Sequence, residues 1–214
     1  MDEDLAIIAK NTKREEIKNF FIKHKKKIYF LMILILLTIF STFFYLDNVK
    51  KQKTEIANKF IKASINYNLK KKAYYLKEFN EIINTHDSTY APLALFFLID
   101  NKVLNSNEEI NYLFDQVLND VNLEKEIKNL VIYKKALINA DFLAENKMIE
   151  ILKPLINSES FWKPHSLLLL GDYFLFKGEK QKAKDFYSQI LTSQKTNENI
   201  FNQAQQRIMK SYGD

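Results

Sequence analysis

The apolar residues after residue 70 recur at intervals that suit helical hairpins. In four stretches they occupy positions i, i+3, i+4, i+7 and i+8, the spacing of one face of an α-helix. Successive copies begin 35, 38 and 35 residues apart. The copies are Tyr75, Phe79, Ile82 and Ile83, with Glu78 in the fifth place; Ile110, Leu113, Phe114, Val117 and Leu118; Met148, Ile151, Leu152, Leu155 and Ile156; and Ala183, Phe186, Tyr187, Ile190 and Leu191.

Other helical segments lie between and beyond these stripes. We expect them at about residues 50–71, 90–103, 124–141 and 161–177, and a ninth helix at about 197–212. One helical hairpin cannot bury its apolar face alone, whereas stacked hairpins can. The sequence therefore predicts an all-α fold, a solenoid of about four helical hairpins with a C-terminal capping helix. The low count of three glycines and three prolines disfavours a turn-rich β fold.

A separate apolar stretch precedes the repeats. Residues 28–46 contain no charged side chain, and as a helix they would span about 28 Å, close to the thickness of a bilayer's hydrocarbon core. Tyr29 and Tyr45 stand at its ends, where amphipathic rings favour the membrane interface. The stretch is longer than the apolar region of a secretory signal peptide. We therefore expect an uncleaved transmembrane signal anchor; the alternative is a buried core helix.

The charges that flank this stretch predict its orientation. The fifteen residues before it hold seven lysines and arginines, and the fifteen after it hold four. Such a bias favours a cytoplasmic N terminus. We expect a cytoplasmic basic tail at 1–27, the anchor at 28–46 and a domain at 47–214 that is periplasmic if the membrane is a bacterial inner membrane. Thr12 and Glu15 have the spacing of a capping box, which predicts a helix start near Lys13.

The sequence contains no recognisable catalytic, metal-binding or phosphate-binding motif. Cysteine is absent, so disulfides and thiolate metal sites are excluded. His24, His86 and His165 form no metal-binding motif, and three glycines are too few for a phosphate-binding loop. The net charge of +6 comes from interspersed lysines, without a nucleic-acid-binding signature. We expect no enzyme activity, no catalytic residue, no metal and no cofactor, and neither nucleic acid nor a small-molecule substrate as partner.

The last repeat resembles the tetratricopeptide repeat. Leu167, Leu170, Gly171 and Phe174 stand where that family has the motif W-x-x-L-G-x-x-Y, and Ala183 and Tyr187 stand where it has A-x-x-x-F. The resemblance implies that the residues that pack the repeat are Gly171, Phe174, Gly178, Ala183 and Tyr187, with Gly178 in the turn between the two helices. Leu167 replaces the family's tryptophan, and Lys195 stands where the family has proline.

The first helices of the hairpins should line the concave surface of such a solenoid. With the register set by Gly171, the inward-facing positions of the last repeat, and hence the candidate protein-binding residues, are His165, Leu168, Asp172, Leu175 and Phe176. A core role is the alternative for several of them. Trp162 has two interpretations as well, packing between repeats or anchoring a ligand.

The whole plan, an N-terminal anchor with flanking lysines followed by about four hairpins, resembles the YfgM-type family. Proteins of that family are ancillary subunits of the bacterial SecYEG translocon with a periplasmic repeat domain. The resemblance implies a protein-binding module at the inner membrane that links the translocon to periplasmic chaperones or nascent secreted chains. The alternative is a scaffold for another cell-envelope assembly, such as the cell-wall or division machinery.

Overall fold

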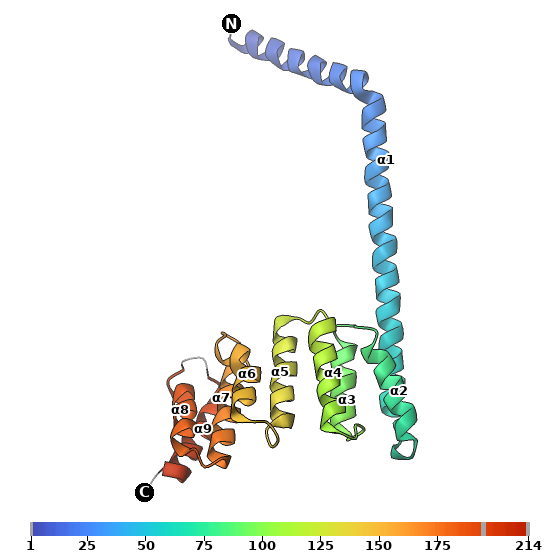
Figure 1. The fold of residues 1–214 in the computed structure, drawn as a ribbon. Coiled ribbons are helices and arrows are strands. Elements are labelled where there is room, and N and C mark those ends of the chain that lie inside the picture. The colour runs from blue at the N-terminus through green and yellow to red at the C-terminus, as the bar shows by residue number, and fades with distance from the viewer. Residues whose placement is uncertain (1, 194–195, 213–214) are drawn as a thin grey trace. The chain divides into compact units, whose positions relative to one another are not determined.

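The computed structural model describes residues 2–193 and 196–212, and these residues form nine α-helices and one short 3-10 helix without any strand (Figure 1). The all-α prediction is confirmed. In chain order the helices are α1 (Asp2–Ile65), η1 (Leu69–Lys71), α2 (Lys72–Ile83), α3 (Tyr90–Asp100), α4 (Asn107–Asp120), α5 (Lys125–Asn139), α6 (Glu145–Ile156), α7 (Lys163–Phe176), α8 (Lys180–Leu191) and α9 (Glu198–Tyr212). The chain divides into two compact units, Met1–Glu55 and Ile56–Asp214.

The first unit is a single helical segment, the N-terminal part of α1. The most apolar 18 residues of this helix have a mean hydropathy of 2.3, and none of them is buried. The helix is therefore long and apolar enough to cross a membrane. The hydroxyl groups of Thr38 and Thr42 donate hydrogen bonds to the carbonyl oxygens of Ile35 and Ile39. Both hydroxyls are therefore satisfied within the helix, as an apolar environment requires.

Two predictions about the ends of this first helix are wrong. Helix α1 begins at Asp2 rather than near Lys13, because the chain between them is helical as well and the capping-box sequence lies inside the helix. The helix also ends at Ile65 rather than near residue 71. The side-chain amide of Asn66 donates to the carbonyl oxygen of Lys62, and the backbone carbonyl of Asn66 accepts the hydroxyl of Tyr75, so local polar contacts replace the next helical turn.

The second unit has the expected repeat organisation. The four apolar stripes lie on α2, α4, α6 and α8, and the helices between them are α3, α5 and α7. Each of these helices packs mainly against its neighbours in the chain, and α9 packs against both α7 and α8. Pro154 lies within α6, which ends at Ile156. The arrangement is a helical solenoid whose last hairpin is covered by α9.

The interior of the second unit consists of two clusters of buried apolar side chains. The first includes Phe79 and Phe114, and the second includes Phe174. Helix α5 contributes Val131 to the first cluster and Ala136 to the second. The repeats therefore share no single continuous core, and α5 is the helix that joins the two halves.

Candidate protein-binding surface

Gly171 lies where α7 and α8 approach each other closely. A Cβ atom at this position would lie 2.2 Å from Cε1 of Tyr187, closer than any real contact, so the ring fits only against glycine. Tyr187 is fully buried, and its hydroxyl donates a hydrogen bond of 2.7 Å to the carboxylate of Asp172. Gly171 thus leaves room for the Tyr187 ring, and its neighbour Asp172 holds the hydroxyl group of that ring.

The other residues expected to pack the repeat lie on the same hairpin. Phe174 of α7 and Ala183 of α8 are both fully buried. Gly178 stands in the turn between the helices with a φ of +80°, in the left-handed region that favours glycine. A Cβ atom at residue 178 would have no other atom within 4 Å. Glycine is therefore favoured there by the backbone conformation and not by lack of space.

Asp172 was expected on the binding surface, and the structure places it between three helices. Its Oδ1 accepts hydrogen bonds from the Tyr187 hydroxyl of α8 and from Nε of Arg207 of α9. The hydrogen bond from Arg207 to this carboxylate raises the pKa of the guanidinium, so the arginine stays charged. The Asp172 carboxylate is engaged in holding α9 to the last hairpin.

The other candidate binding residues divide into core and surface positions. Leu168 is only 8% exposed and belongs to the second buried cluster, and Leu175 is partly buried against the same cluster. Phe176 is 79% exposed at the end of α7. His165 is half-buried near the start of α7. Phe176 is thus the most exposed of the five candidates, and His165 and Leu175 keep part of their surface exposed.

His165 belongs to a cluster of four rings between α5 and α7. Tyr133 and Trp162 are stacked with ring centroids 5.4 Å apart, and the His165 ring lies 5.2 Å from Trp162 and 5.1 Å from Phe161. Burial among these rings lowers the pKa of His165, an effect that its contact with the Phe161 carbonyl oxygen partly offsets. Burial also raises the pKa of Tyr133. Both side chains are therefore neutral at pH 7, which suits an apolar surface.

A buried polar contact fixes the loop that carries two of these rings. Ser160 accepts hydrogen bonds from the side-chain amide of Asn129 and from the backbone amide of Trp162, and its hydroxyl donates to the carboxylate of Glu126. Asn129 and Ser160 are both buried. Because Glu126 and Asn129 lie on α5, this contact ties the start of α7 to α5 and positions Phe161 at the surface.

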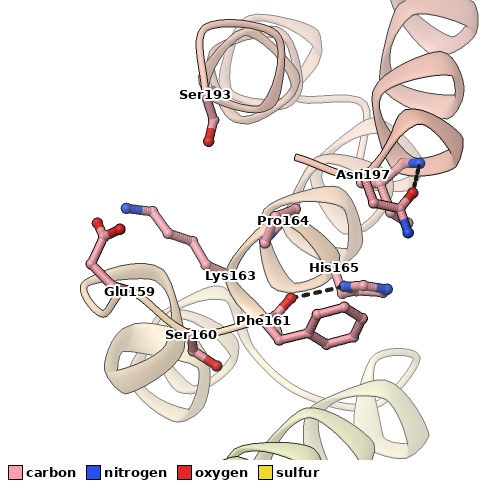
Figure 2. A pocket seen from close by; sticks show the side chains of 9 residues that line it. Glu159, Ser160, Phe161, Lys163, Pro164, His165, Ser193 and Asn197 are labelled. Carbon is pink, nitrogen blue, oxygen red and sulfur yellow. Dashed lines mark hydrogen bonds between the residues drawn. The ribbon is translucent and has the colours of Figure 1, made fainter. Parts of the chain in front are cut away.

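A hollow of about 180 Å³ opens beside the ring cluster (Figure 2). Figure 2 shows Lys163 and Glu159 extending on one side of it, and Phe161 and His165 on the other. Asn197, close to the start of α9, completes the far wall. The hollow thus combines an aromatic wall with a charged rim, and it lies between the first helix of the last hairpin and the capping helix.

A second hollow, of about 290 Å³, lies between the beginnings of α3 and α5. Its lining includes Leu93 and Phe96 of α3 and Ile127 and Leu130 of α5. Leu93 and Ile127 are exposed, although they belong to helices whose other faces fill the core. We call the two hollows and the ring cluster between α5 and α7 the first-helix surface, because every part of it involves α3, α5 or α7.

Sequence reasoning found only part of this surface. His165 was identified from the register, but the partners Tyr133 and Phe161 were not, and Trp162 was left between two interpretations. The sequence did contain an indication of the cluster. Phe161 and Trp162 stand side by side directly before α7, and two adjacent large rings at the start of a helix are seldom both buried in the core, so at least one of them is expected at the surface. Among the residues that the structure describes, no group of three or more His, Cys, Asp or Glu side chains is placed to hold a metal ion.

Comparison with known proteins gives one match. The family model described as "Tetratricopeptide repeat-like domain" matches residues 18–210. The match begins before the apolar stretch at 28–46 and ends within α9, so it includes this stretch and the repeats together. A search of curated proteins and a search of solved structures each found no significant match. Since the family model covers most of the chain, the protein belongs to the tetratricopeptide repeat-like domain family.

Proposed function

We propose that this protein is a membrane-anchored protein-binding module that receives partners on the first-helix surface. The observation that carries the proposal is the ring cluster beside the hollow, where Phe161 is 61% exposed next to the stacked pair Tyr133 and Trp162. Figure 2 shows the Phe161 and His165 rings of this cluster. Aromatic side chains held rigidly at a surface supply contact area at low entropic cost, and they are enriched at protein interfaces.

The shape of this surface favours flexible partners with apolar side chains. Its hollows are shallow and separate, so each has room for one or two side chains and neither encloses a ligand. An extended segment that places apolar groups in them would bind weakly. A tether to the membrane raises the local concentration of such a surface near partners that emerge there, so modest affinity is sufficient.

We further propose that the membrane is the bacterial inner membrane, with residues 1–27 in the cytoplasm and the repeat domain in the periplasm. On this proposal the protein is an ancillary subunit of the SecYEG translocon that meets periplasmic chaperones or nascent secreted chains. The support is the surplus of lysine and arginine before the span and the resemblance to the YfgM-type plan. The family match that includes anchor and repeats is consistent with that plan.

Site-specific photo-crosslinking in cells tests the partner. A photo-reactive phenylalanine analogue replaces Phe161 on the first-helix surface or Phe40 in the span, both of which are exposed. Tyr112, exposed on α4, is the control position outside the first-helix surface. We expect a Sec subunit, a secreted chain or a periplasmic chaperone at 161 or 40, and much less at 112. Reproducible recovery of another envelope complex at 161 and 40 would instead favour a scaffold for that assembly.

A further inference from the structure

The residues directly before the membrane span, 17–27, carry only positive charges. From residue 17 to residue 46 the chain contains no aspartate or glutamate, and it contains five lysines, all before the span. These are Lys18, Lys23, Lys25, Lys26 and Lys27, and all five are exposed. Glu15 and Glu16 lie just before Lys18, but Lys23, Lys25, Lys26 and Lys27 have no carboxylate within one helical turn in the sequence. A cation cluster of this kind, directly joined to an apolar helix, attracts the anionic headgroups of a bilayer.

One face of this segment also forms a hollow. It is open, measures about 330 Å³, and is lined by Ile22, Lys25, Ile28, Tyr29 and Met32. Lys25 and Tyr29 are one helical turn apart, so the ammonium and hydroxyl groups supply two neighbouring donors. The other three lining side chains are apolar. Lys18 lies seven residues before Lys25, on the same side but about 10 Å away along the helix, and it does not line the hollow.

We propose that this hollow binds an anionic phospholipid at the membrane boundary. The phosphate group is held by Lys25 and the Tyr29 hydroxyl with Lys18 nearby, and the first part of an acyl chain lies against Ile28 and Met32. A zwitterionic lipid is disfavoured, because its own cation has no carboxylate to meet among the residues that line the hollow. A free phosphate would leave the apolar wall unused. This inference rests on the proposed role of α1 as a membrane anchor.

Lysines on the two opposite faces of the helix allow a matched comparison, in which the same number of charges is removed from either face. The purified full-length chain is reconstituted into nanodiscs that contain equal amounts of phosphatidylglycerol and phosphatidylethanolamine, and the lipids retained on the released protein are counted by native mass spectrometry. The variant Lys18→Gln/Lys25→Gln removes two charges from the face of the hollow. The control Lys23→Gln/Lys27→Gln removes two charges about 160° away around the helix. Tyr29→Phe removes the hydroxyl alone.

We expect the wild-type chain to retain phosphatidylglycerol in preference to phosphatidylethanolamine. Loss of a positive charge near an anionic surface by itself costs about 1 kcal/mol, or about fivefold in the preference for each lysine, and the Lys18/Lys25 variant should lose more than this because the hollow is lost as well. The control pair should lose clearly less, and Tyr29→Phe should lower the preference without any change of charge.

An equal loss in both lysine pairs would overturn the site, because the preference would then follow net charge alone; so would retention of both lipids in equal amounts. Failure of the chain to enter nanodiscs would overturn the site together with the anchor. The test contains no candidate partner protein, only the nanodisc scaffold. Its outcome is therefore separate from the crosslinking result, which tests the translocon proposal.

Discussion

Asn111 and Asn139 form a closed pair of hydrogen bonds between α4 and α5, in which each side-chain amide donates to the other's oxygen at 2.9 Å. Asn139 is only 3% exposed. The remaining N–H of each amide group donates to a backbone carbonyl oxygen, of Asn107 and of Lys135 respectively. The pair therefore joins α4 to α5 with all four of its N–H donors satisfied.

We predict that either Asn111→Leu or Asn139→Leu alone destabilises the repeat domain by about 1–3 kcal/mol, because the remaining asparagine is left without its partner in a poorly solvated place. The double variant should recover much of this loss, since two apolar side chains leave no unsatisfied group. Urea unfolding of the fragment 47–214, followed by far-UV circular dichroism, measures each free energy. Additive losses in the double variant would show that the two amides do not act as a pair.

Gly171→Ala should destabilise the fragment by about 1–3 kcal/mol, because the added methyl group would meet the buried Tyr187 ring, and Gly171→Leu should cost more. In a Tyr187→Leu background the cost of Gly171→Ala should largely disappear. Gly178→Ala serves as the control, because its cost comes from the left-handed backbone and should be the same with either residue at 187. Melting temperatures check both. An unchanged melting temperature for Gly171→Leu would contradict the packing of α7 on α8.

The repeat domain should lose stability as the pH falls through the ordinary pKa of histidine, 6.5, because burial lowers the pKa of His165 in the folded state. In that range the unfolded chain binds the proton more readily than the folded chain does, so acid favours unfolding. The effect is modest because His165 is partly solvated. The loss of unfolding free energy between pH 7.5 and 5.5 should be smaller in His165→Gln than in wild type. His86→Gln, which removes a histidine outside the ring cluster, should leave the loss unchanged if His165 is responsible.

The orientation of the anchor can be measured with single cysteines, because the natural chain has none. Asn19→Cys lies before the span and Asn119→Cys lies on α4, and both positions are exposed. We predict that a membrane-impermeant maleimide added to spheroplasts labels residue 119 and labels residue 19 only after the membrane is permeabilised. The seven positive residues before the span against four after it are the physical reason. Labelling of residue 19 alone would reverse the proposed topology.

The features that the sequence predicted well are those that depend only on residues close together in the chain. Helices α2, α4, α6 and α8 follow from apolar spacing within each segment, and the charge-free stretch at 28–46 needs only its own composition to be identified. The ends of α1 were predicted less well. A capping-box sequence such as Thr12 to Glu15 does not stop a helix whose preceding residues are also helical, and the turn at Asn66 depends on a hydroxyl from Tyr75.

The binding residues show most clearly where local pattern is insufficient. The register placed His165, Leu168 and Asp172 on one helical face, but the face alone does not say which neighbour covers each position. In the structure Leu168 is covered by the core and Asp172 is held by Arg207, 35 residues later. A helical face becomes surface or core only through the helix packed against it.

The sequence by itself therefore determined the helices, their repetition and the apolar stretch at 28–46, because each depends on residues within about two turns of one another. The tertiary structure decided the rest. It assembled Tyr133, Phe161, Trp162 and His165 into one cluster, paired Asn111 with Asn139, and assigned Asp172 to the capping helix. The physical reason is that these contacts join side chains from separate segments. Their distances are set by how helices pack, which no single stretch of sequence encodes.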